Sequence, residues 1–257
     1  MELNLNCDLG EKSNYYDGRN DHNLIKIINT ANIACGFHAG NIKEIKKTIL
    51  DSKNNSVSIG AHPSFKDKEN FGRKRINLSL KEIDILINDQ LNIIDKISKK
   101  LNYPITHVKP HGALNNMACE NFELAKQIGN SIKKFNDNLI YMVLPKTEMI
   151  NAAKKIEIRY ACEIFADRNY NEAGLLIERS DPNALITDPE KALENISEMI
   201  EKKSIKTLSG KLIKTEIDTI CIHGDGYNAI EIAKKIKNGL ETKGIVFKPL
   251  NKLNKFQ

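Results

Sequence analysis

The chain has 257 residues, of which 40% are hydrophobic and 28% are charged, and its formal net charge is +6. These values exclude a disordered or fibrous chain, and the lysines occur in scattered pairs without interleaved aromatics, which argues against a nucleic-acid partner. Five cysteines without a CxxC spacing predict reduced thiols, and the sequence shows neither a signal-peptide pattern nor an apolar run of membrane-spanning length, so we expect a cytoplasmic protein that binds no membrane.

Short apolar runs alternate with longer amphipathic runs along the chain. Strands are predicted over residues 2–7, 30–35, 57–61, 105–109, 139–144, 159–163 and 219–222. Helices are predicted over residues 21–29, 41–54, 79–100, 122–135, 146–155, 189–202 and 227–243. Residues 174–188 and 205–216 interrupt the alternation and are predicted to form hairpin-like insertions. Regular β/α alternation without a linker predicts one α/β domain over residues 1–257, in which about seven parallel strands close into a barrel.

One face of each predicted strand is polar or small. Asn4, Asn6 and Asp8 share such a face in the first strand, and their apolar neighbours point to the opposite side. In the second strand, Asn32 and Ala34 are expected to line the interior as small residues that leave room. A barrel interior used only for packing is filled with Val, Ile and Leu. We therefore expect a polar interior that holds a ligand.

The carboxyl ends of the predicted strands carry ionisable residues beside glycine or proline. Histidines take this position four times, and we expect at least three of them to line one pocket, because barrel active sites lie at the strand C-termini: His38, His62, His111 and His223. The same ends carry Asp8, Glu11, Lys109, Glu163, Asp167, Arg168 and Asp225.

Simpler structural roles are open for several of these residues. Asp8 and Glu11 could cap the first turn, and Asp167 with Arg168 could form an ion pair that serves only the loop. Lys109 requires either a carboxylate neighbour or an anionic ligand, because an unpaired buried ammonium is costly.

Two kinds of chemistry suit this set of residues. An aspartate with several histidines can hold a divalent metal that activates water, and the candidate ligands are Asp8, His38, His62 and His111. The same residues with Lys109 can also work without a metal, as a general base and an oxyanion partner. Both possibilities favour hydrolysis of a carbonyl compound. The sequence contains no Walker A and no GxGxxG motif, so a standard phosphate-binding loop is not indicated.

Several multi-residue motifs occur in order over roughly residues 1 to 245: NLNCDLGE, ANIACGFHAG, IGAHPSF with FGRKR, HVKPHGAL, EIFADRNY with GLLIERS, and TICIHGD. They resemble the LamB/YcsF family, the A subunits of bacterial 5-oxoprolinase. The resemblance implies an irregular seven-stranded β/α barrel of the TIM-like glycoside hydrolase/deacetylase type. It also implies ATP-dependent hydrolysis of 5-oxo-L-proline (pyroglutamate) to L-glutamate, with ATP and Mg²⁺ as co-substrate and with partner subunits B and C.

Residue by residue, the resemblance and the polar face together assign roles. The expected catalytic residues are Asp8, His62, Lys109 and His111. The expected substrate-binding residues are Asn6, Glu11, His38, Glu163, Asp167, Arg168, His223 and Asp225. Lys109 and Arg168 are expected to meet the anionic carboxylate or phosphate, while Asp8 with His62 or His111 positions water.

The sequence departs from the family pattern at Lys12-Ser13-Asn14, at Asn115 and at Gly226-Tyr227. These positions are expected in loops outside the polar face. Two other functions stay open: a stand-alone metal-dependent deacetylase or amidohydrolase, and a non-catalytic lactam-binding subunit. Metal content and self-association of the chain are open as well.

Overall fold

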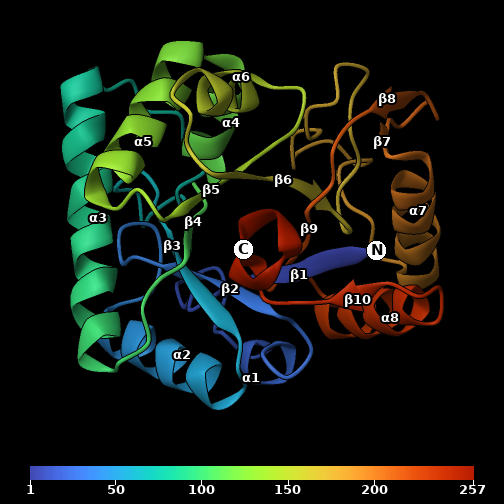
Figure 1. Cartoon of the computed structure of the whole chain (residues 1–257), viewed down its shortest axis with the longest axis horizontal. Helices are drawn as coiled ribbons and strands as arrows, with labels where there is room; N and C mark the ends of the chain where they lie inside the picture. Colours follow the sequence, from blue (N-terminus) through green and yellow to red (C-terminus); the bar gives the residue numbers. More distant parts are fainter.

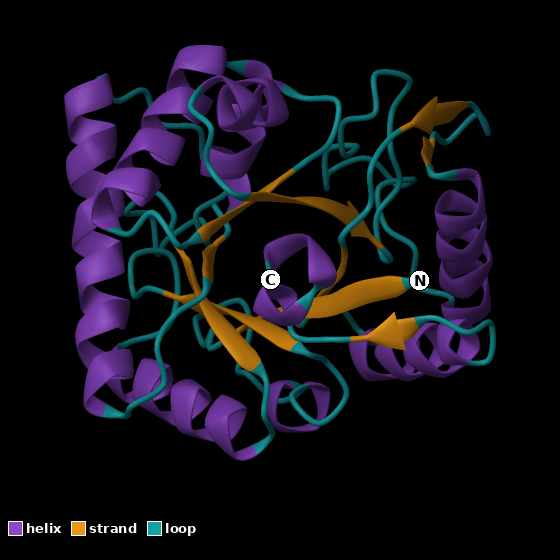
Figure 2. Ribbon diagram, in the orientation of Figure 1, coloured by secondary structure: helices purple, strands orange, loops and turns teal.

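Seven parallel strands form a closed barrel in the computed structural model, which describes residues 1–257 (Figures 1 and 2). In order around the barrel they are β1 (Glu2–Leu9), β2 (Thr30–Ala34), β3 (Ser58–His62), β4 (His107–Val108), β5 (Ile140–Val143), β6 (Tyr160–Phe165) and β9 (Thr219–His223). The barrel closes where β1 pairs with β9, from Asn4 opposite Thr219 to Asp8 opposite His223. A short strand, β10 (Val246–Phe247), pairs with the first residues of β1. The predicted seven-stranded β/α barrel is confirmed.

Helices surround the barrel and cover its outer face (Figure 2). They are α1 (Asp21–Leu24), α2 (Ile42–Asn54), α3 (Leu80–Lys100), α4 (Gly112–Glu120), α5 (Phe122–Phe135), α6 (Glu148–Lys155), α7 (Pro189–Lys202) and α8 (Ala229–Glu241). Ser79 caps the N-terminus of α3 and forms a capping box with Glu82, and Asn41 caps α2 through its side-chain oxygen. No helix combines the length and the hydropathy of a transmembrane segment.

The main hydrophobic core lies between the strands and the helices. It contains the apolar strand residues that were expected to point outward, such as Leu5, Ile59 and Ile220. Because these side chains occupy the outer face of the barrel, the alternating positions of the same strands must point inward.

The barrel interior has two layers. At the end where the strands begin, the C-terminal turns η1 (Leu250–Lys252) and η2 (Asn254–Phe256) form an apolar plug that lies over the barrel centre (Figure 1). In this plug Leu250 and Leu253 pack against Ile140, Met142 and Ala161. Above it, polar side chains fill the barrel.

The polar layer is continuously hydrogen-bonded. The Asn32 amide donates to Asn6 at 2.7 Å and to Asp8 at 2.8 Å, and its oxygen lies 2.8 Å from Nε2 of His107. Asn6 in turn donates to Glu163 at 3.0 Å and to Thr219 at 2.7 Å. The expectation that Asn32 leaves room for a ligand is therefore wrong, because its neighbours' side chains fill that space.

Five elements and one loop segment differ from the sequence-based prediction. Helix α4, strand β10 and the terminal turns were not predicted, and α1 is a single turn instead of a helix over residues 21–29. The 205–216 insertion is an antiparallel hairpin of β7 (Ser204–Lys206) and β8 (Leu212–Lys214). Residues 174–188 form no pair of strands. Isolated β-bridges, such as the one between Arg168 and Leu185, connect this segment to the rest of the chain.

Candidate active site

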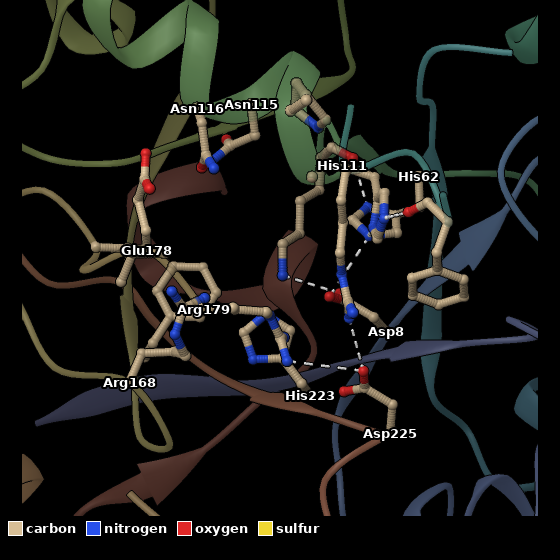
Figure 3. Close-up of a pocket in the computed structure, with 18 of the residues that line it drawn as sticks. Asp8, His62, His111, Asn115, Asn116, Arg168, Glu178, Arg179, His223 and Asp225 are labelled. Atoms are coloured by element: carbon tan, nitrogen blue, oxygen red, sulfur yellow. Dashed lines mark hydrogen bonds and ion pairs between the residues drawn. The ribbon is translucent and has the colours of Figure 1, made fainter. Parts of the chain in front are cut away.

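A cavity of about 480 Å³ opens at the C-terminal end of the barrel strands (Figure 3). Residues at or after the ends of five of the seven strands, β1, β3, β4, β6 and β9, line it, so side chains far apart in the sequence meet there. The expected site residues on its wall are Asp8, Glu11, His62, Lys109, His111, Arg168, His223 and Asp225.

The remaining expected site residues lie one layer behind the wall. Asn6, His38, Glu163 and Asp167 are buried but do not line the cavity, so their assignment as substrate-binding residues stays a prediction. Asn6 and Glu163 point into the barrel from β1 and β6, and His38 and Asp167 lie in the loops that follow β2 and β6. Each of the four is hydrogen-bonded to another polar side chain of this cluster, so they hold the site in position.

A buried ion cluster forms the floor of the cavity. The Lys109 ammonium lies 2.9 Å from Oδ1 of Asp8 and 3.0 Å from both Oε1 of Glu163 and Sγ of Cys221. Lys109 thus has the carboxylate neighbours that its burial requires, and it still reaches the cavity. Burial opposes its charge, but Asp8 and Cys221 raise the pKa of Lys109 well above its usual value. Burial also opposes ionisation of Asp8, yet His62 and Lys109 hold the pKa of Asp8 well below its usual range.

Three imidazoles and one carboxylate form a second cluster beside the first. Glu11 Oε1 lies 3.0 Å from Nε2 of His38, 3.2 Å from Nδ1 of His111 and 3.7 Å from Nε2 of His62. Burial, followed by the charge of Asp8, raises the pKa of Glu11 to about 7. Burial lowers the pKa of both His38 and His111, whereas Asp8 and Glu11 outweigh burial at His62 and raise its pKa.

The opposite wall is formed by residues after β6 and β9. Nδ1 of His223 lies 2.9 Å from Asp167, whose carboxylate also accepts the His223 backbone N–H. Asp167 thus pairs with His223 rather than with Arg168. The Arg168 guanidinium instead donates to the carbonyls of Ile177 and Ala184 and so holds the 169–186 loop against the barrel.

Sequence reasoning missed further arginines in this wall. Arg73 and Arg179 both approach Oδ2 of Asp225, at 2.9 Å and 3.7 Å, and Arg75 also lines the cavity. Desolvation, followed by the charge of Arg179, lowers the pKa of Arg73. The motifs FGRKR and GLLIERS contained these residues, and a search for arginines in loops after strands would have found them.

Two local features shape the mouth of the cavity. Gly72 has φ +66°, and a Cβ there would lie 2.2 Å from Oγ of Ser64, so the turn at Phe71 and Gly72 closes tightly over the imidazoles.

Asn115 lines the cavity from the first turns of α4. Its expected place outside the polar face is wrong, because α4 begins at Gly112 directly after β4.

Fold and site together define a TIM-like β/α-barrel protein with a buried carboxylate–imidazole site at the C-terminal end of its strands. Solved structures of that fold class include the catalytic domain of a peptidoglycan N-acetylglucosamine deacetylase from Eubacterium rectale, with TM-score 0.52 over 96% of this chain and 87% of that chain at 10% identity. The LamB/YcsF family model matches residues 3–255, and the chain belongs to this family.

Curated relatives match over almost their whole length. The 5-oxoprolinase A subunit of Clostridium beijerinckii is 42% identical over 98% of this chain and 99% of the relative. That of Staphylococcus haemolyticus is 40% identical over 95% of this chain and 98% of the relative. A lactam utilization protein from Thermus thermophilus superposes with TM-score 0.89 at 35% identity, covering 96% of this chain and 99% of that one.

Proposed function

We propose that this chain is the A subunit of an ATP-dependent 5-oxoprolinase, which opens 5-oxo-L-proline to L-glutamate together with partner subunits B and C. The names of the relatives support the reaction. The observation that carries it is a cavity in which Arg168 and Arg179 lie opposite a wall of carboxylates and imidazoles (Figure 3). Lys109 lines the same cavity. In this proposal ATP, with Mg²⁺, is the co-substrate of the assembled enzyme.

The two walls suit the two ends of the substrate. 5-Oxoproline carries one carboxylate and one lactam carbonyl. Guanidinium groups of Arg73 and Arg179 would bind the carboxylate or a phosphate, because their planar donors match such anions. Asp8 with His62 or His111 would position water at the carbonyl carbon, while Lys109 stabilises the negative charge that develops on oxygen.

The requirement for ATP follows from the substrate. A five-membered lactam is resonance-stabilised and a poor electrophile. Transfer of a phosphoryl group from ATP to the amide oxygen releases ADP and makes the carbonyl carbon a better electrophile. Water then adds to the carbon and the ring C–N bond breaks, which releases the amine and leaves an acyl phosphate. A second water yields glutamate and inorganic phosphate.

Reconstitution tests this function. The purified chain is mixed with its two partner subunits, 5-oxoproline and Mg-ATP, and glutamate is measured against mixtures that lack one component. We expect glutamate only in the complete, ATP-containing mixture. Equal glutamate release without this chain would refute the proposal. Binding of 5-oxoproline to the isolated chain, with full turnover by an Asp8→Asn variant, would instead identify a lactam-binding subunit.

A stand-alone metal-dependent deacetylase or amidohydrolase is the second candidate, because a buried group of Glu11, His38, His62 and His111 could hold a metal ion. It predicts hydrolysis by the isolated chain without ATP. If the activity survives thorough chelation in a magnesium-free assay without ATP, the metal-dependent hydrolase is eliminated.

A further inference from the structure

The hydrogen bonds of two cavity histidines fix where their protons lie. Nδ1 of His62 is 2.6 Å from the Lys109 carbonyl oxygen, and Nε2 of His111 is 2.9 Å from the Phe71 carbonyl oxygen. A carbonyl oxygen only accepts, so both of these nitrogens carry hydrogen. A neutral imidazole has a single N–H, which leaves lone pairs on Nε2 of His62 and Nδ1 of His111. These two nitrogens lie 2.9 Å apart, a separation that requires a cation or a proton between them.

The distances around this point fit a metal ion. Ligand atoms bound tetrahedrally at roughly 2.0–2.1 Å are about 3.3 Å apart. The separations among His62 Nε2, His111 Nδ1 and Glu11 Oε1 are 2.9, 3.2 and 3.7 Å. Two imidazoles and a carboxylate form a donor set typical of catalytic zinc, and ligand histidines commonly donate their second N–H to a backbone carbonyl, as both do here.

His38 does not belong to this ligand set, although it also contacts Glu11. Its ring stacks on that of His111 with centroids 3.9 Å apart and planes 9° from parallel. The lone pair of an imidazole nitrogen lies in the ring plane, so one ion cannot lie in two stacked, parallel planes. With Nε2 3.0 Å from Glu11 Oε1, His38 instead orients the carboxylate from behind.

The local charge also favours a cation. The buried carboxylates of the two adjoining clusters are Asp8, Glu11 and Glu163, and the buried ammonium among them is that of Lys109. When these carboxylates are ionised and the imidazoles are neutral, three negative charges and one positive charge leave a surplus of two negative charges, and buried charges require a counter-charge. A divalent ion supplies that charge.

We propose that Glu11, His62 and His111 bind one divalent transition-metal ion, such as Zn²⁺, with Asp8 beside it and a remaining coordination position open to the cavity. All three ligands line the cavity, whereas His38 does not. Three protein ligands with an open position are typical of a catalytic site, where the ion polarises a carbonyl and lowers the pKa of bound water. The site follows from these residues alone and does not depend on the proposed reaction.

Metal binding by the full chain tests the site directly. The protein is stripped with chelator, dialysed against Zn²⁺ or Co²⁺, and analysed for bound metal, while the visible absorption of the Co²⁺ form reports coordination geometry. We expect about one ion per chain, four- or five-coordinate Co²⁺ bands and a rise in Tm on binding. If wild type binds no more metal than a His62→Ala/His111→Ala variant, the proposal is overturned and a shared proton occupies the gap.

Single variants locate the ion. Glu11→Gln and His111→Ala should lose stoichiometric binding, whereas His38→Ala should keep the stoichiometry with affinity lowered about 10–100-fold. His223→Ala removes a histidine from the same cavity and should bind like wild type, with folding of each variant checked by circular dichroism. Loss of binding in His223→Ala, with binding kept in His111→Ala, would place the ion elsewhere and refute the assignment. If the chain binds metal but the complete mixture releases no glutamate, the proposed function is refuted and this site is not. If the mixture releases glutamate but the chain binds no metal, this site alone is refuted.

Discussion

At the scale of single residues, the site depends on a lysine that is almost completely buried. Lys109 is 4% exposed and neutralises Asp8 and Glu163. Replacing it with Met removes the charge but keeps the approximate volume, and it leaves two carboxylates facing each other.

We expect Lys109→Met to lower the free energy of unfolding by about 3–5 kcal/mol, measured by urea denaturation. The matched control is Lys191→Met, which removes a lysine from an exposed pair with Glu194 and should leave stability nearly unchanged. Equal stability of the Lys109→Met variant and wild type would mean that the buried charges do not depend on one another.

Asp8 and His111 are predicted to act in the chemical step. In reconstituted assays we expect Asp8→Asn and His111→Ala each to reduce glutamate release by about 100-fold, which is the usual contribution of a general acid or base. Asp17→Asn, an exposed aspartate of the same loop region, should keep full activity. Activity within twofold of wild type in both site variants would show that the assignment is wrong.

A partly buried aspartate outside the cavity provides a pH test. Asp21 accepts hydrogen bonds from the Gly10 N–H and the Tyr16 hydroxyl, and burial raises the pKa of Asp21 to about 6. A carboxyl group that binds its proton more tightly when folded stabilises the protein at low pH, and this contribution is lost as pH rises from about 4 to about 6.

In the Asp21→Asn variant the side chain at position 21 cannot bind or release a proton. Its free energy of unfolding relative to wild type should therefore rise by roughly 1–3 kcal/mol between pH 4 and pH 6, measured by denaturation at several pH values. A difference that is constant across this range would contradict the raised pKa.

The sequence allowed prediction of the residues at strand ends but not of their partners. Asp8, His62 and His111 were predicted because regular alternation brings strand C-termini together. Arg73 and Arg179 were missed because the fold of the loops, not strand periodicity, brings them to the cavity. The burial of His38 behind the residues that line the cavity was not predicted, because the strand pattern does not show which neighbour stands in front of a side chain.

At the scale of elements, close packing inside the barrel depends on a glycine of β3. A Cβ on Gly60 would lie 2.3 Å from the His107 ring, and this ring is held by Asn32 and Thr106 and cannot move aside. The glycine thus makes room for a neighbouring side chain and not for a ligand.

We expect Gly60→Ala to lower the free energy of unfolding by about 3 kcal/mol or more through overpacking. The control is Gly226→Ala, whose Cβ would make an ordinary contact at 3.5 Å with the His223 carbonyl oxygen, and its effect should stay below about 1 kcal/mol. Equal effects of the two substitutions would show that the barrel interior tolerates the added methyl group.

Elements with strong periodicity were predicted well, and weakly patterned ones were not. The seven barrel strands and the long helices α3 and α5 appear close to their predicted positions. Helix α4 was missed because its sequence, GALNNMACE, begins with glycine after HVKPH and has no clear apolar stripe. Strand β10 has only two residues, and it forms only because it pairs with β1, which is remote in sequence.

At the scale of the whole molecule, the two ends of the barrel have separate tasks. The C-terminal turns close the end where the strands begin, and the cavity occupies the end where they finish. No pattern in the last residues predicted this plug, because its apolar residues are few and gain their role only from the barrel that surrounds them. The hydrogen-bonded polar layer lies between plug and cavity, so stability and chemistry should be separable by mutation.

Leu250→Ala tests this separation. Leu250 is fully buried against Ile140 and Met142, so its truncation should lower the free energy of unfolding by about 2–5 kcal/mol. Because the cavity lies beyond the polar layer, KM for 5-oxoproline should stay within about twofold of wild type below the unfolding transition. Leu212→Ala, a partly exposed leucine of the β7–β8 hairpin, should change stability by less than about 0.5 kcal/mol. A several-fold change in KM for Leu250→Ala would show that the plug is coupled to the site through the polar layer. The hydrogen bonds of Asn32 and Asn6 would then connect the two.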